Sequence, residues 1–425
     1  MAKRPLGLSK SNKAKRAKRD QDKAGAGTSN VSSANNSKEG TPQLTLEVEE
    51  GEDPEDELVQ LRAMWKRYFH EERQSEPLLN GVINECNGLL IKSDQDGTEL
   101  DTEYLAIFAF ALVESIYTED GYHPEMHELF ERALEVLDRG FKQNPKDKLL
   151  GLTYANLCFT RIITEYMSQL KPDSNESEKQ WAIETLLKDA MSKFSIYNED
   201  MKMTYAVLTE LNTLLELVGH FNSSNAVAED GLDSDVEEDV EDLDEGEEED
   251  DDKIGSIAET HPLYPLRLRS RDHFEWGREQ LVELYKALPT DDDIKFKREV
   301  ATMIGELYLK KAAAPTRKFL RLRYDNDEEE EETDTAMCQE AQQGAIKAIA
   351  SALEYLRDAQ DPDSTDSWVA VAEAYIDLGN VCDNESCEQD NAYGEAEKLL
   401  RKANIAAHGK YDEVLSKFVQ DQQAE

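Results

Sequence analysis

The sequence predicts a protein built entirely of α-helices, arranged as a tetratricopeptide-like helical-repeat solenoid. Three observations lead to this prediction. Glycine and proline, which interrupt helices, number only 21 and 12 among 425 residues. Apolar residues recur at the spacing of one helix face over two long regions, whereas no segment shows the strict alternation of a half-buried strand. Short motifs of the tetratricopeptide repeat lie inside these two regions.

The chain opens with a segment, residues 1–52, that we expect to be a disordered basic arm. Eight of the first twenty residues are Lys or Arg and one is acidic, whereas the whole chain has a formal net charge of −44. A Ser-, Asn- and Gly-rich stretch follows, so the segment has too few apolar groups to offset the entropy lost on ordering. Seven of the cations form a candidate nuclear import signal: Lys3, Arg4, Lys13, Lys15, Arg16, Lys18 and Arg19.

A nuclear import receptor is the partner that this arm fits best, because such a receptor needs only flexible, exposed Lys and Arg. Contact with RNA or the ribosome, and a merely solvated tail, stay open as alternatives. The arm has no aromatic residue to stack on bases, and the acidic body would repel phosphate, so we do not expect direct binding of nucleic acid. Residue 2 is Ala rather than the Gly that accepts a myristoyl chain. We therefore expect a nuclear protein that contacts no membrane.

The first helical half is predicted over residues 53–225. Asp53 can cap a helix that begins at Pro54, and the apolar residues after it share one helical face. The apolar run YLAIFAFALV, residues 104–113, is about half of the roughly 20 residues that cross a bilayer, so we interpret it as a buried helix. A second-helix motif of the tetratricopeptide repeat follows, with the matching residues Ala133, Leu137, Gly140 and Pro145.

An acidic linker that we expect to be disordered follows at residues 226–258. Residues 229–252 contain 17 acids and no base, so the block repels itself and stays solvated. It is either a solubilising spacer or a docking surface for basic proteins such as ribosomal proteins and histones, and both interpretations stay open. Ser234 is a candidate phosphorylation site because acidic residues follow it closely.

Residues 259–420 form the predicted C-terminal half, which is tetratricopeptide-like and carries an acidic insert at 325–335. Small residues at fixed positions let the paired helices of each repeat approach closely. The first-helix motif occurs twice, at Ala301, Ile304, Gly305 and Tyr308 and at Trp368, Val371, Ala372 and Tyr375. Matching second-helix residues are Ala352, Leu356, Ala359, Ala396, Leu400 and Ala403.

The register of the two first-helix motifs predicts a partner-binding face. The positions that would face a ligand are Glu299, Thr302, Glu306, Leu309, Asp366, Val369, Glu373, Ile376 and Asp377. The acids among them would suit a basic or amphipathic segment of a partner. The alternative is an ordinary solvated helix face. Cations also gather beside the acidic inserts, notably Arg317, Lys318, Arg321 and Arg323, and we favour their pairing with acidic loops of the same chain over the capture of an acidic partner.

No pattern indicates catalysis or a cofactor. The chain has five Cys, an odd number spread over both halves, which suggests a reducing compartment rather than a disulfide framework. His123 and His127 lie four apart and Cys382 and Cys387 five apart, but neither pair has a second pair nearby to complete a metal site. Phosphate-binding and nucleophile motifs are lacking. We expect a protein that is not an enzyme and holds no metal.

Seven blocks in order along the chain resemble the fungal enhancer of translation termination family. They are MAKRPLGL at the start, NGVINEC (80–86), FSIYNED (194–200), HPLYPL (261–266), GELYLKKA (305–312), AEAYIDLGN (372–380) and KANIAAHGKYDEVL (402–415). The family includes the negative regulator of a prolyl-hydroxylase-type 2-oxoglutarate dioxygenase. The resemblance implies an all-helical nuclear adaptor that binds such a dioxygenase and promotes correct translation termination, with the ribosome or the termination machinery as a further candidate partner. The rival hypotheses are an acidic chaperone for ribosomal proteins or histones, acting through 229–252, and an RNA binder acting through residues 1–23.

Overall fold

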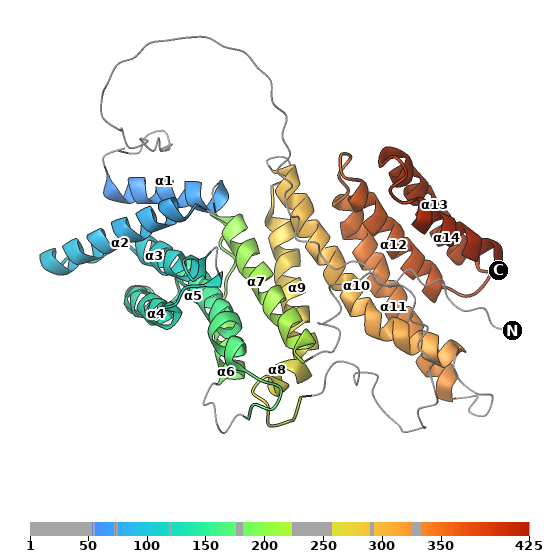
Figure 1. Ribbon diagram of the computed structural model, residues 1–425, viewed down its shortest axis with the longest axis horizontal. Coiled ribbons are helices and arrows are strands. Elements are labelled where there is room, and N and C mark those ends of the chain that lie inside the picture. The colour runs from blue at the N-terminus through green and yellow to red at the C-terminus, as the bar shows by residue number, and fades with distance from the viewer. Residues whose placement is uncertain are drawn as a thin grey trace, which may run out of the picture. The chain divides into compact units, whose positions relative to one another are not determined.

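The computed structural model describes residue 53, residues 56–71, residue 73, and residues 75–118, 121–175, 182–222, 257–289, 293–324 and 333–424 (Figure 1). Within these ranges the chain forms helices and one short antiparallel ladder, which pairs β1 (Tyr117–Thr118) with β2 (Gly121–Tyr122). The prediction of an all-α protein is confirmed. The basic arm, nearly all of the acidic linker and most of the acidic insert lie outside the described residues.

The described chain divides into two compact units, and the division falls inside α10 between Leu307 and Tyr308. The prediction that two helical halves are separated by residues 226–258 stays a prediction. The N-terminal unit, up to Leu307, contains α1 (Glu57–His70), α2 (Glu76–Asp96), α3 (Thr102–Glu114), α4 (Met126–Gln143), α5 (Lys148–Arg161), a π-helix (Ile162–Tyr166), a 3-10 turn (Met167–Gln169), α6 (Ile183–Lys193), α7 (Met201–His220), α8 (Tyr264–Leu268), α9 (Ser270–Ala287) and the first half of α10 (Ile294–Tyr324).

Aspartates at helix starts set several boundaries in the N-terminal unit. The carboxylate of Asp147 accepts the backbone N–H groups of Leu149 and Leu150 at 2.9 and 3.0 Å, so it caps α5. Asp56 caps α1 in the same way, through the N–H of Leu58 at 2.8 Å. The predicted start at Pro54 is therefore three residues early, because Asp56 rather than Asp53 supplies the cap.

Helix α3 lies at the centre of the N-terminal unit. Every residue from Tyr104 to Val113 is buried, as expected for a helix that is apolar on all sides. It packs against α4 and α5, while α1 and α2 pack together beside it. Close approach of α4 and α5 depends on Gly140, because a Cβ there would lie 2.7 Å from Cδ2 of Leu150. The small residue in the repeat motif thus has the packing role that its spacing predicts.

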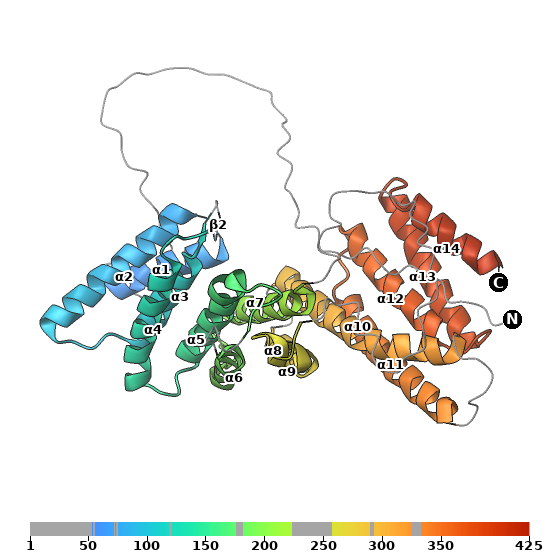
Figure 2. The same cartoon turned by 60° about the horizontal axis from the view of Figure 1, so that its bottom comes forward.

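The C-terminal unit contains the second half of α10, α11 (Thr333–Asp358), α12 (Thr365–Val381), α13 (Cys387–Ala406) and α14 (Asp412–Ala424). Helices α11 to α14 lie side by side in chain order (Figures 1 and 2). Their core consists largely of small side chains, which let the backbones approach, with aromatic rings filling the remaining space. Between α12 and α13, a Cβ on Gly379 would collide with the ring of Tyr393. The helical-repeat prediction is confirmed in this unit.

Candidate protein-binding surfaces

Three of the predicted partner-facing acids share one face of α12. Asp366, Glu373 and Asp377 are spaced i, i+7 and i+11, which places them within one narrow stripe of a helix. The opposite face of α12 packs into the core through residues such as Ala372 and Tyr375. The three acids therefore lie on the side of α12 away from these core residues.

Asp366 is already paired within the chain. Nζ of Lys410 lies 2.7 Å from Oδ1 of Asp366, and the hydroxyl of Tyr411 donates a hydrogen bond to the same oxygen. The contact with Lys410 has the larger effect and that with Tyr411 the next, and together they hold the pKa of Asp366 below its usual range. Asp366 thus ties α12 to the segment before α14, and 72% of its side-chain surface is still exposed.

Asp377 has a different environment. Its side chain is half-buried and forms no hydrogen bond or ion pair with any part of the chain that the structure describes. Burial alone raises the pKa of Asp377 to about 6. Buried charges normally have an ion-pair or hydrogen-bond partner that offsets the free energy of their desolvation. The Asp377 carboxylate has none among the described residues, and a cation of a ligand would supply one.

Two apolar positions of the same predicted face are not available to a ligand. Ile376 is 1% exposed, and Val369 is half-buried against the core. Leu309 on α10 is likewise packed against this core. The prediction was wrong for Ile376, because packing from neighbouring helices covers more of α12 than a repeat register alone can reveal.

The other predicted acids lie on α10 in the N-terminal unit. Glu299 and Glu306 are exposed, and Thr302 between them donates its hydroxyl to the carbonyl of Arg298 at 2.9 Å. The hydroxyl of Tyr205 on α7 lies 3.4 Å from the carbonyl oxygen of Glu299. Burial and the charges of Glu299 and Glu306 raise the pKa of Tyr205 to about 12, so both carboxylates lie near this ring. The two predicted groups of acids therefore belong to different units.

A cavity of about 760 Å³ in the N-terminal unit was not anticipated from the sequence. Its apolar lining comes from α1, α3, α5 and α10, at Trp65, Ile107, Leu149 and Phe296. The segment 197–203 forms another wall, and most of it belongs to the block FSIYNED that carries the family resemblance. The block FSIYNED therefore marked part of the cavity wall in the sequence, but only the structure shows that a cavity lies beside it.

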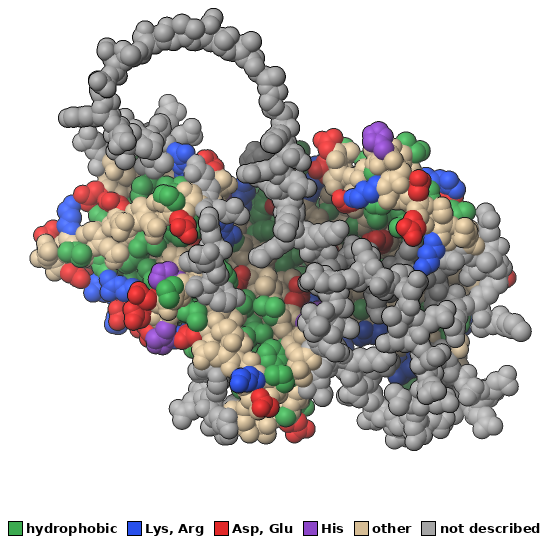
Figure 3. All heavy atoms as spheres, viewed as in Figure 1, with side chains coloured by type: hydrophobic (Ala, Val, Ile, Leu, Met, Phe, Trp, Pro, Cys, Tyr) green, Lys and Arg blue, Asp and Glu red, His purple; other side chains and the backbone are tan. Residues whose placement is uncertain are grey.

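Two ion pairs and one hydrogen bond between distant segments line the same cavity. Arg62 of α1 and Glu103 of α3 are 2.7 Å apart, Nε2 of His70 lies 2.9 Å from Asp200, and Nζ of Lys202 lies 2.8 Å from Asp293. Cations and carboxylates are thus paired across the lining, and Figure 3 shows the same interspersion of acidic and basic side chains over the described surface of the N-terminal unit. The cavity can accept an apolar side chain or a short segment.

Other predicted sites have less structural support. The import-signal cations and Ser234 lie outside the described residues. In the described ranges, no group of three or more His, Cys, Asp or Glu side chains is placed to hold a metal ion, and Nδ1 of His127 instead lies 2.7 Å from Glu165. No helix in these ranges is long and apolar enough to cross a membrane.

Comparisons with known proteins agree along almost the whole chain. Residues 1–419 match the family described as nuclear pore complex subunit Nro1. Enhancer of translation termination 1 of Saccharomyces cerevisiae is 38% identical over 434 residues, covering 99% of this chain and 100% of the relative. The protein of that name from Eremothecium gossypii is 36% identical over 429 residues, covering 98% of each chain.

A solved structure supports the fold independently. The S. pombe nuclear import adaptor Nro1 aligns with a TM-score of 0.51, covering 87% of this chain and 98% of that chain. The sequence identity of this alignment is 13%, so the alignment supports the shared helical fold alone. The resemblance stated from the seven sequence blocks is confirmed by the full-length relatives.

Proposed function

The chain belongs to the Nro1 family, together with the yeast proteins named enhancer of translation termination 1, and from this premise we propose that it is a non-enzymatic nuclear adaptor. In this proposal the helical surface holds a prolyl-hydroxylase-type 2-oxoglutarate dioxygenase and thereby promotes correct translation termination. The family names support a role in termination and an association with nuclear transport. The dioxygenase is the partner that the sequence resemblance implies.

The observation that best supports partner binding is the half-buried carboxylate of Asp377 in the acidic stripe of α12, which no described residue pairs. A side chain whose ionisation is disfavoured by burial, and which receives no compensation within the described chain, is typical of a functional rather than a structural position. Glu373 lies one turn before it on the same face. A Lys or Arg of the partner would form a charge-assisted hydrogen bond with Asp377 and offset its desolvation.

The test is a calorimetric titration of the organism's own dioxygenase into the full chain. The variant Glu373→Gln with Asp377→Asn keeps the shape of both side chains and removes their charge. We expect stoichiometric binding to the wild type and about tenfold weaker binding to the variant. This difference corresponds to the loss of one or two partly desolvated charge contacts. Glu354→Gln, an exposed acid on α11, is the matched control and should bind like the wild type. Equal affinities for all three chains would contradict the proposal.

Deletion variants separate the rival functions. The adaptor should bind its partner after deletion of residues 229–252 or of residues 1–23. A chaperone for basic proteins would lose binding without 229–252, and an RNA binder would lose it without residues 1–23, with a steep dependence on salt. The import signal is tested separately: replacing Lys15, Arg16, Lys18 and Arg19 by Gln in a fluorescent fusion should abolish nuclear accumulation and leave the dioxygenase affinity unchanged.

A further inference from the structure

A stripe of positive charge runs along the second half of α10. Residues 307–324 contain six cations and no acid, in a chain whose formal net charge is −44. Five of them define what we call the cationic stripe, and each is exposed: Lys310, Lys311, Arg317, Lys318 and Arg321.

Helix geometry places these cations on the side away from the core. Lys310, Arg317 and Arg321 are spaced i, i+7 and i+11, and Lys311 and Lys318 form a parallel row beside them. The core side of the same turns carries Ala312 and Phe319, which are 3% and 1% exposed. At 1.5 Å per residue, the stripe is about 17 Å long.

Two of the five cations of the stripe have no structural use among the described residues. Arg317 and Lys318 form no ion pair or hydrogen bond with the described residues, although the chain is rich in carboxylates. Like charges four residues apart on a helix, as Arg317 and Arg321 are, are mildly destabilising. Counter-charge supplied by a partner would remove this repulsion.

Acids limit the length of a ligand at both ends of the stripe. Glu306 is exposed one turn before Lys310, and seven of the eight residues that follow Tyr324 in the sequence, 325–332, are Asp or Glu. A long polyanion lying along α10 would meet these like charges, whereas a segment of five or six residues would end before them. The aromatic rings of this segment do not form a continuous stacking platform for bases. Phe319 is buried, Tyr308 is stacked on Tyr355 with ring centroids 5.8 Å apart, and Tyr324, at the end of the helix, is left partly exposed.

We propose that the cationic stripe is a docking surface for a short acidic segment of a protein partner. This surface is distinct from the acidic stripe of α12, and the inference does not depend on the identity of the partner bound there. Arg317 and Arg321 would each hold a carboxylate through two N–H groups, while the lysines would add attraction at longer range. The ligand class is an acidic peptide, not a nucleic acid.

The test measures binding of a fluorescein-labelled hexaglutamate peptide to the full-length protein by fluorescence polarisation, at low and at physiological ionic strength. Arg317→Gln, Lys318→Gln and Arg321→Gln are combined in one variant. The control combines Lys398→Gln, Arg401→Gln and Lys417→Gln, three exposed cations of the same unit. We expect the stripe variant to bind the peptide about tenfold more weakly than the wild type, because three partly screened charge contacts are lost. The affinity of the control variant should stay within about twofold of the wild-type affinity.

Three other results would overturn the proposal. Equal loss in both variants would mean attraction by net charge alone. Binding of a labelled oligouridine in place of the peptide, with loss in the stripe variant, would assign the stripe to nucleic acid. Absence of peptide binding, accompanied by self-association of the wild type that the stripe variant abolishes, would assign the stripe to a second copy of this chain. Circular dichroism of each variant checks that α10 is intact.

Discussion

Nε2 of His261 lies 3.0 Å from the carbonyl oxygen of Lys171, so that this ring joins two segments ninety residues apart in the chain. Nδ1 of the same ring accepts the backbone N–H of Leu263 at 3.2 Å. The ring is fully buried and lies against Phe221, with centroids 5.1 Å apart. The neutral imidazole, protonated on Nε2, satisfies both contacts, whereas the imidazolium would lose the acceptor that Leu263 needs.

This arrangement predicts a pH-dependent stability. Burial lowers the pKa of His261, so the unfolded chain takes up its proton at a higher pH than the folded chain does. The contribution of His261 is therefore complete at neutral pH and is lost as the pH falls below about 6.5, the usual value for histidine. Urea unfolding of the wild type and of His261→Gln at neutral and mildly acidic pH tests this.

For His261→Gln we expect a loss of about 2 kcal/mol at neutral pH, from two buried hydrogen bonds and imperfect packing, and a smaller loss in acid. His220→Gln, at an exposed position near the end of α7, is the control and should leave the pH profile unchanged. A loss for His261→Gln that is equal at both pH values would contradict the assignment.

Even the smallest side chain at position 151 should destabilise the folded protein strongly. A Cβ at this position of α5 would collide with the backbone carbonyl of Lys193 at the end of α6, and a backbone atom cannot move aside as a side chain can. We expect Gly151→Ala to lower the free energy of unfolding by about 3 kcal/mol. Gly88→Ala in α2 is the matched control: nothing lies within 4 Å of its Cβ, so it should raise stability by up to about 1 kcal/mol. Chemical denaturation would measure both, and a neutral Gly151→Ala would mean that α5 and α6 are not in close contact.

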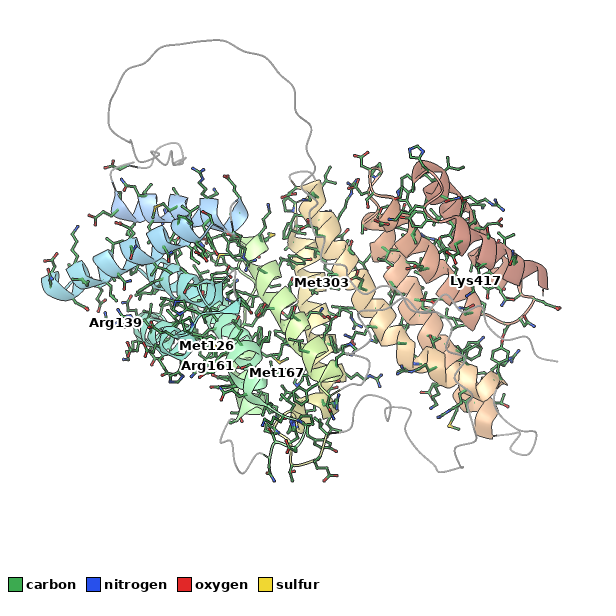
Figure 4. All side chains as sticks on the ribbon, in the orientation of Figure 1. Met126, Arg139, Arg161, Met167, Met303 and Lys417 are labelled. Carbon is green, nitrogen blue, oxygen red and sulfur yellow. The ribbon has the colours of Figure 1, made fainter. Side chains whose placement is uncertain are left out.

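Arg161 and Glu165 form a buried ion pair around the π-helix that follows α5. Nε of Arg161 lies 2.6 Å from Glu165, Glu131 accepts a second bond at 2.8 Å, and the guanidinium lies 5.5 Å from the ring centre of Phe130. Arg161 is 9% and Glu165 8% exposed, and Figure 4 shows Arg161 among the packed side chains of the N-terminal unit.

Removing one member of this pair should therefore be costly. Arg161→Leu leaves the carboxylate of Glu165 buried without its main partner, and we expect a loss of about 3–5 kcal/mol in the free energy of unfolding. The double variant Arg161→Leu with Glu165→Leu should be markedly more stable than Arg161→Leu, because the orphan charge is gone. A double-mutant cycle by thermal or urea unfolding measures the coupling, and additive losses would show that the two side chains act independently.

Local rules predicted the helices of this chain well because its motifs are local. The repeat spacing located the close approach at Gly140 and the buried position of Ala372, and the apolar run 104–113 marked the central helix. A local rule failed at Pro315, which lies inside the 31-residue helix α10 although proline removes an N–H and disfavours a helix interior. The helix nevertheless continues through Pro315, whose ring lies against α11: a Cβ on Gly344 of α11 would lie 3.6 Å from Cβ of Pro315.

The candidate sites were harder to predict because they depend on contacts between distant segments. Periodicity placed Asp366 and Asp377 on one face of α12 but could not show that Lys410 neutralises the first, or that the second has no partner in the described part of the chain. The hydrogen bond between His70 and Asp200 spans 130 residues and has no sequence signature, so the cavity that it lines was not foreseen.

Asp377 should limit stability in the free protein and support affinity in the complex. Because burial raises its pKa to about 6, the stabilising contribution of its neutral form is present below the usual pKa near 4 and is lost as the pH rises through about 6. Asp377→Asn removes this ionisation. We expect it to raise the free energy of unfolding at neutral pH by about 1–2 kcal/mol, after allowance for the part of the side chain that solvent reaches.

The same substitution should weaken binding of the dioxygenase, because the partner's cation would lose its carboxylate. Urea unfolding from mildly acidic to neutral pH, combined with calorimetric titration of the partner, gives both readouts on one variant. The stability gain should vanish near pH 4, where the wild-type side chain is also largely neutral. Greater stability with unchanged affinity would leave Asp377 as an ordinary destabilised carboxylate, whereas unchanged stability would show that solvent or a neighbouring group already compensates its charge. A gain in stability joined to a loss of affinity is the result expected of a side chain retained for binding at the expense of the fold.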